Sequence, residues 1–124
     1  MKRIVVLEDD TTFRKLIVSE INKSDSYECI ASFSKINDFV KELPNLFPDL
    51  FWLDISLPDG LSINYIAKIK QLFPGSLCMI CSMHDDDDKV FAALKAGADG
   101  YLLKNSTLEK MIEGIEELFQ GGSP

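Results

Sequence analysis

The hydrophobic residues of this chain alternate between two spacings, and this alternation limits the fold more than any other feature. Short runs in which nearly every residue is apolar are followed by longer segments whose apolar residues stand three and four positions apart. The apolar runs span 3–8, 27–33, 49–55, 76–82 and 99–104. The segments with helical spacing span 11–23, 35–43, 62–73, 87–96 and 106–120. Strands alternating with helices predict an α/β fold, a five-stranded parallel sheet in a doubly wound (βα)5 three-layer sandwich.

Length and charge narrow the class of protein further. The chain has 124 residues, of which 46% are hydrophobic, which is enough for one domain with a hydrophobic core. Its net charge of −7 argues against direct binding of nucleic acid or of an anionic membrane, and suits a divalent cation or a basic partner. We find no signal peptide and no apolar stretch long enough to span a membrane, so we expect a cytoplasmic protein without a membrane partner.

Three cysteines are present, and two of them, Cys78 and Cys81, form a C-x-x-C pattern. An odd number of cysteines fits a reducing compartment. The pattern lies in an apolar run predicted to be a strand, where residues three apart face opposite sides and stand about 10 Å apart. We therefore predict buried structural cysteines here, in preference to a disulfide or a zinc site.

Polar groups follow four of the five predicted strands at their carboxyl ends. In a parallel α/β sheet, ligands bind beyond these ends. The groups are Glu8, Asp9 and Asp10 after the first strand, Asp54 after the third, Ser82 after the fourth and Lys104 after the fifth.

Carboxylates crowded at one edge repel one another unless a cation lies between them. A set of hard oxygen ligands, without histidine or thiolate, indicates Mg²⁺ or alternatively Mn²⁺. A lysine beside such an ion would offer a positive charge to a second phosphoryl oxygen, and this is the role we assign to Lys104. Asp54 is then the candidate nucleophile, and the product would be an aspartyl phosphate.

The ordered set of motifs resembles the CheY-like receiver domain of two-component response regulators, over the whole chain. An acidic pair follows the first strand in "VLEDD", and the phosphoacceptor pattern D-x-x-x-P appears as "DISLP". A serine ends the fourth strand in "MICS", and an aromatic residue and a lysine lie in "GADGYLLK". The matching residues are Glu8, Asp9, Asp54, Pro58, Ser82, Tyr101 and Lys104.

The resemblance implies a flavodoxin/CheY-like fold and a role for each of these groups. Asp54 would accept a phosphoryl group from a sensor histidine kinase or a phosphotransfer protein, and the domain would catalyse only its own phosphorylation and dephosphorylation. Glu8, Asp9, Asp54 and the backbone carbonyl of Ser56 would hold Mg²⁺. Ser82 and Tyr101 would form a switch that changes the surface of the fourth helix, fifth strand and fifth helix.

Two further segments, "ALKAGADGYLLK" and "GGSP", resemble the NarL-type subfamily, whose members carry a LuxR-like helix-turn-helix. We therefore expect residues 1–120 to form the receiver domain and residues 121–124 to begin a linker to an output domain that this chain lacks. DNA would be bound only through that domain, to control transcription, and a homodimer is possible.

The chain departs from the family pattern in the loop after Asp54 and after Lys104. Ser62 stands where a glycine is common, Gly60 comes two residues early, and Asn105 replaces a frequent proline. A pseudo-receiver that binds partners without phosphorylation is the main alternative. A haloacid-dehalogenase-type phosphatase is disfavoured, because it needs a second acid where Ser56 stands.

The most acidic stretch, "HDDDD" at 84–88, contains the chain's only histidine but is not our candidate metal site. It directly precedes a predicted helix, where negative charge near the amino end is favourable. We expect these aspartates to begin the helix. By the same argument Asp10 belongs to the start of the first helix, although from sequence alone it competes with Glu8 and Asp9 for the metal.

Overall fold

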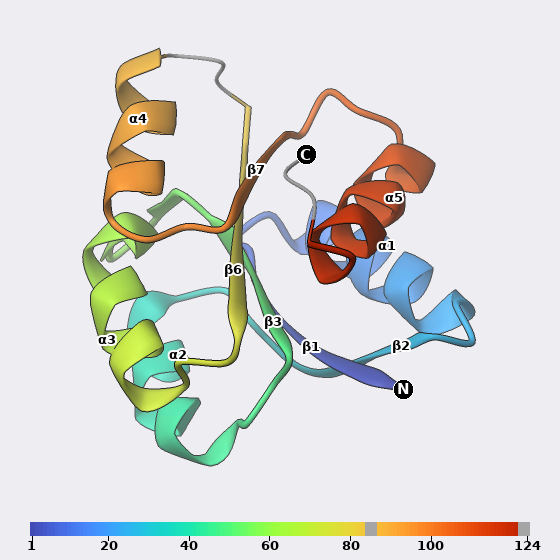
Figure 1. Ribbon diagram of the computed structural model, residues 1–124, viewed down its shortest axis with the longest axis horizontal. Helices are drawn as coiled ribbons and strands as arrows, with labels where there is room; N and C mark the ends of the chain where they lie inside the picture. The colour runs from blue at the N-terminus through green and yellow to red at the C-terminus, as the bar shows by residue number, and fades with distance from the viewer. Residues whose placement is uncertain (84–86, 122–124) are drawn as a thin grey trace.

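A computed structural model describes residues 1–83 and 87–121 of the chain, and its centre is a five-stranded sheet. All neighbouring strands are parallel, in the order β2-β1-β3-β6-β7 (Figure 1). The strands are β1 (Lys2–Leu7), β2 (Tyr27–Phe33), β3 (Leu50–Asp54), β6 (Leu77–Ser82) and β7 (Gly100–Leu103). The helices are α1 (Thr11–Lys23), α2 (Ile36–Glu42), α3 (Ile66–Leu72), α4 (Asp87–Lys95) and α5 (Leu108–Phe119). The predicted doubly wound (βα)5 sandwich is confirmed.

Two hydrophobic cores lie on opposite faces of the sheet. Helices α1 and α5 cover one face, and α2, α3 and α4 cover the other (Figure 1). Successive residues of each strand point to opposite faces, so that in β3 Phe51 and Leu53 pack toward α2 and α3 while Leu50 and Trp52 pack toward α1 and α5. Because both faces are buried, the inner strands are continuous apolar runs, which is the pattern that identified them.

The C-x-x-C pair follows the same alternation. Cys78 is buried in the core beneath α2 and α3, whereas Cys81 is buried in the core beneath α1 and α5. Cys29, Cys78 and Cys81 are all free thiols. Burial raises the pKa of the Cys78 thiol to about 12, so this residue is not poised for thiolate chemistry. The interpretation of this pair as structural is confirmed.

The segment after β3 differs from the single loop that we expected. It forms a small antiparallel hairpin, β4 (Ser56–Leu57) with β5 (Gly60–Leu61), followed by a 3₁₀ turn, Ser62–Tyr65, before α3 begins. Gly60 has a φ of +150°, and a Cβ built there would lie 3.3 Å from the Ile36 side chain. Only glycine adopts this conformation without strain, so the hairpin explains why a glycine stands at this early position.

A second close approach joins α5 to the edge strand β7. Gly114 is buried in α5, and a Cβ added to it would lie 3.0 Å from the Leu102 side chain of β7. The absence of a side chain at Gly114 therefore lets the helix backbone pack directly on the strand.

Helix α4 begins at Asp87, with Asp88 next to it, as expected for acids that start a helix. His84, Asp85 and Asp86 lie outside the described residues, as do 122–124, which include most of the predicted linker. Among the helices of residues 1–83 and 87–121, none is long and apolar enough to cross a membrane.

Candidate functional site

The site lies where the chain order of the strands reverses. β1 is bonded to β2 on one side and to β3 on the other, and in such sheets this reversal opens a crevice at the carboxyl ends of the strands. Leu7, the last residue of β1, pairs with Leu53 of β3. The residues that follow them, Glu8 and Asp54, are thereby placed side by side.

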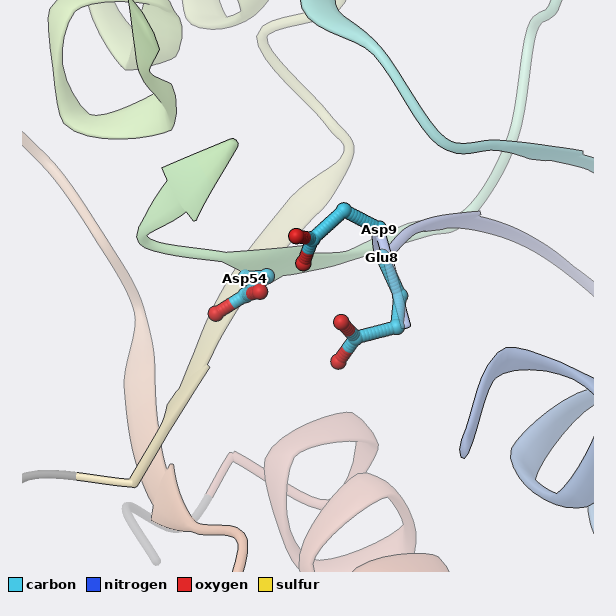
Figure 2. A group of neighbouring side chains, drawn as sticks. All are labelled: Glu8, Asp9 and Asp54. Carbon is cyan, nitrogen blue, oxygen red and sulfur yellow. The ribbon is translucent and has the colours of Figure 1, made fainter. Parts of the chain in front are cut away.

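Three carboxylates meet at this point (Figure 2). Glu8, Asp9 and Asp54 each offer one oxygen, and these oxygens lie within 4.8 Å of one another. Glu8 is fully buried and Asp54 is 7% exposed, whereas Asp9 is open to solvent. Oxygen ligands that are partly open to water suit Mg²⁺ or Mn²⁺, which usually keep several water ligands. The residues present therefore fit the predicted divalent ion.

Lys104 brings a positive charge to the two buried carboxylates. Its ammonium group forms an ion pair with Glu8 Oε1 and lies 3.2 Å from Asp54 Oδ2. Burial of Lys104 disfavours its charge, but the hydrogen bond to Glu8 and the neighbouring carboxylates outweigh this effect and raise the pKa of Lys104. The lysine is therefore a permanent cation within reach of Asp54.

The electrostatic environment of Asp54 is unfavourable to its negative charge. Burial, followed by the charge of Glu8, raises the pKa of Asp54 to about 7, although Lys104 acts in the opposite direction. One oxygen, Oδ1, accepts a hydrogen bond from the Ile55 amide at 2.9 Å. A single lysine thus compensates the gathered carboxylates incompletely, which leaves charge for a divalent cation to neutralise.

The start of α1 holds Glu8 in place. Asp10 caps the helix, with Oδ1 accepting from the Phe13 amide at 2.9 Å, and its own amide donates to Glu8 Oε2 at 3.0 Å. The guanidinium of Arg14 donates to the Glu8 carbonyl at 2.8 Å. Asp10 therefore caps the helix and bonds to Glu8, whereas the carboxylates that lie close enough together to hold a metal ion are those of Glu8, Asp9 and Asp54.

Ser82 ends β6 and Lys104 directly follows the neighbouring strand β7, so both lie near Asp54 at the end of β3. The Lys104 amide donates to the Ser82 carbonyl at 2.8 Å, and Asp54 pairs with Cys81, the residue before Ser82. Ser82 is 3% exposed. Tyr101 is half-buried against the core beneath α2, α3 and α4. The sheet thus brings Ser82, Asp54 and Lys104 to one edge.

Ser56 and Ser62 occupy the two ends of the hairpin region that follows Asp54. Ser56 is exposed and is the first residue of β4, two positions after Asp54. Ser62 is 1% exposed, its amide donates to the Ile55 carbonyl at 2.9 Å, and its hydroxyl has no hydrogen-bond partner among the described residues. The serine that replaces the usual glycine is therefore accommodated inside the fold.

Two aromatic residues at the site, Phe13 and Trp52, were not predicted to be part of it. Phe13 lies under Lys104, with the ammonium nitrogen 5.3 Å from the ring centroid, and stacks on Trp52. Phe13 stands at helical spacing with Leu16 and Ile17, which indicated only a core position. Trp52 is fully buried in the core beneath α1 and α5.

Known proteins resemble this chain in sequence and in fold. The family described as "response regulator receiver domain" matches residues 4–116. The chain is 32% identical to the oxygen regulatory protein NreC of Staphylococcus epidermidis over 120 residues, which are 96% of this chain and 55% of that protein. It is 28% identical to the transcriptional regulatory protein DegU of Brevibacillus brevis over 121 residues, which are 98% of this chain and 51% of that protein.

The fold also matches solved structures. The beryllofluoride-activated NtrC4 receiver domain dimer aligns with a TM-score of 0.87 and 26% identity, covering 98% of each chain. The chain spans about half the length of these two curated relatives: the aligned residues are 55% of NreC and 51% of DegU. Sequence motifs, fold and site geometry lead to one family: the chain belongs to the response regulator receiver domains.

Proposed function

We propose that Asp54 accepts a phosphoryl group from a phosphohistidine on a sensor histidine kinase or on a phosphotransfer protein. The observation that carries this proposal is the position of Asp54 at the carboxyl end of β3, next to Glu8 and 3.2 Å from the Lys104 ammonium group. A carboxylate between acids that bind a cation and a buried lysine has the surroundings that phosphoryl transfer requires, namely positioning and neutralisation of the oxygens.

The reaction is a displacement at phosphorus. An oxygen of the Asp54 carboxylate forms the new O–P bond while the bond from phosphorus to the donor breaks. The electron pair of that bond leaves with the donor, which is the imidazole of a phosphohistidine or the acetate of acetyl phosphate. Lys104 faces Asp54 Oδ2 and neutralises one phosphoryl oxygen as charge builds up on the transferred group.

Glu8, Asp9 and Asp54, with the backbone carbonyl of Ser56, would hold the divalent ion. Mg²⁺ in this position supplies a positive charge to the phosphoryl oxygens. The Asp10 amide donates to the Glu8 carboxylate and orients it, and the Arg14 guanidinium donates to the Glu8 backbone carbonyl.

The proposed output uses the edge of the sheet next to Lys104. Ser82 would bond a phosphoryl oxygen, Tyr101 would turn inward, and the surface of α4, β7 and α5 would change. Two relatives support transcription as the output, since one is named a transcriptional regulatory protein and both are about twice as long as this chain. We infer a cytoplasmic regulator in which residues 121–124 begin the connection to a DNA-binding segment, and in which receiver domains pair, as they do in the NtrC4 dimer.

One experiment tests the central claim. The protein is incubated with Mg²⁺ and acetyl phosphate, and its intact mass is measured over time, in parallel with Asp54→Asn. We expect one phosphoryl adduct on the natural chain, dependent on Mg²⁺ and absent from the variant. No adduct would favour a phosphorylation-independent interaction module, and rapid repeated release of phosphate from an ester would favour a phosphatase.

A further inference from the structure

The Lys104 ammonium group has a neighbour that neither the metal site nor the acceptor accounts for. Besides Glu8 and Asp54 it lies over the Phe13 ring, 5.3 Å from the centroid, a distance at which a cation is attracted to the negative face of an aromatic ring. The Lys104 side chain is only 10% exposed, so little bulk water screens this attraction. The lysine is thus held by two carboxylates and one ring.

The Phe13 ring is itself fixed from two directions. It stacks on Trp52, with ring centroids 5.9 Å apart and planes inclined by 29°, and Trp52 is fully buried in the core. The backbone of Phe13 is bonded to the Asp10 cap of α1 at 2.9 Å. A ring held by the core and by a helix cap is a rigid support, in contrast to the flexible lysine stem that lies across it.

We propose that Phe13 is a positioning residue, which keeps the Lys104 ammonium group beside Asp54 when the carboxylates are neutralised. This inference rests on the proposed phosphoryl transfer to Asp54. In the metal-free protein, Glu8 and Asp54 attract Lys104 strongly. A divalent ion held by Glu8, Asp9 and Asp54 would weaken that attraction, because it would compete for the same negative charge. The attraction of the ring does not depend on the carboxylates, so its share in holding the lysine is greatest when the reaction takes place.

The chain contains a matched control for this contact. The Lys2 ammonium group lies over the Phe119 ring, also at 5.3 Å, and Phe119 stacks on Tyr27 at 5.8 Å. Phe119 ends α5, and Lys2 begins β1, so this pair lies at the amino edge of the sheet, away from the carboxylates. Phe119→Leu therefore removes the same kind of interaction without touching the site.

The experiment compares Phe13→Leu, Phe13→Tyr and Phe119→Leu with the natural chain, after urea unfolding has shown that each is folded. The maximal rate of phosphorylation by acetyl phosphate at saturating Mg²⁺ is measured by intact mass. We expect Phe13→Leu to lower this rate about three- to tenfold, from the usual strength of a desolvated cation–ring contact. Phe13→Tyr keeps the ring face and should restore the rate to within about twofold, and Phe119→Leu should leave it within the same range.

A second measurement does not depend on phosphorylation. Protons near the Lys104 ammonium group lie over an aromatic ring, so their NMR signals should be shifted upfield in the presence of Mg²⁺. The shift should be lost in Phe13→Leu and kept in Phe13→Tyr and Phe119→Leu. Equal rates for the two leucine variants, or a lysine signal unchanged by Phe13→Leu, would overturn the role of Phe13. Absence of an adduct on the natural chain would instead overturn the acceptor role of Asp54, and the positioning role with it.

Discussion

A lysine pairs with carboxylate at both the amino and the carboxyl ends of the strands, but the ratio of positive to negative charge differs between these two places. At the amino edge, Lys70 of α3 bonds to Asp99 at 2.5 Å and to the Ser76 carbonyl at 2.7 Å. Asp99 also accepts from the Cys78 amide at 2.8 Å. One positive charge here meets one negative charge, and each group has a bonding partner. At the carboxyl edge, Lys104 faces Glu8 and Asp54, and Asp9 adds a third acid.

Because of this difference, the balanced Lys70–Asp99 pair supports the fold, whereas the group around Lys104 is suited to a chemical reaction. The Lys70–Asp99 pair ties α3 to the adjacent ends of β6 and β7, and no further ion is needed there. The Lys104 cluster holds excess negative charge in a buried place, which is unfavourable for folding and which a divalent cation would neutralise. Four substitutions test the comparison, and they are ordered by the size of the effect that we expect.

Replacing Lys104 should have the largest effect on stability. Lys104→Met leaves the buried Glu8 without a cation, and we expect the free energy of unfolding to fall by about 2–4 kcal/mol in the absence of divalent ions. Added Mg²⁺ should restore part of the loss, because it supplies the missing positive charge. Urea unfolding with EDTA and with Mg²⁺ measures both effects. Lys70→Met is the control, and an equal response of the two variants to Mg²⁺ would contradict the distinction.

Replacing Asp54 should stabilise the protein. Because its pKa is raised to about 7 in the folded protein, ionising Asp54 opposes folding, so stability is lost as pH rises from about 4 through 7. Asp54→Asn removes this effect, and in EDTA at pH 8 we expect a gain of about 2 kcal/mol, which disappears near pH 4. Urea unfolding at several pH values provides the measurement. A gain in stability of the same size at all pH values would show that ionisation of Asp54 does not oppose folding.

Replacing Asp99 should weaken the fold by a smaller amount. Asp99→Asn breaks the ion pair with Lys70 and weakens the bond to the Cys78 amide, so we expect a loss of about 1–2 kcal/mol. The loss should not change with Mg²⁺ or between pH 5 and 8, and hydrogen exchange at the Cys78 amide should accelerate. A loss of stability that depends on Mg²⁺ would contradict the comparison, because the charges at the two edges of the sheet would then influence each other.

Replacing Asp59 should have the smallest effect. Its carboxylate accepts from the Asn37 and Ile36 amides, at 2.9 and 2.8 Å, and these bonds lower its pKa. Stability from this group is therefore present at neutral pH and is lost as pH falls below about 4, the reverse of the Asp54 profile. Asp59→Ala should lower the melting temperature slightly at pH 7 and leave it unchanged at pH 3. An equal decrease at both values would exclude the carboxylate as the cause.

The sheet, the helices and the edge where the acids gather could be predicted because each depends on local patterns. An apolar run predicts a buried strand, and the polar residue after it marks the carboxyl end, so Glu8, Asp54 and Lys104 were placed together without a structure. The hairpin at 56–61 was missed, and its contacts are not local: Asp59 accepts a hydrogen bond from the Ile36 amide at the start of α2, 23 positions away. The contact of Phe13 with Lys104 was missed for a related reason: an apolar residue at helical spacing looks the same whether its ring packs in the core or under a charge.

The close approach of α5 to β7 has a mechanical consequence. A Cβ at Gly114 would lie 3.0 Å from the Leu102 side chain, so the backbone of α5 at this glycine lies close against a side chain of β7. Leu102 stands directly after Tyr101 and two residues before Lys104. A displacement of β7 at the acceptor end would press Leu102 against the α5 backbone, so the two elements would move together. Gly114→Ala would place a Cβ against the Leu102 side chain, which would have to shift by a few tenths of an ångström, and this variant would test the coupling without altering a charged group.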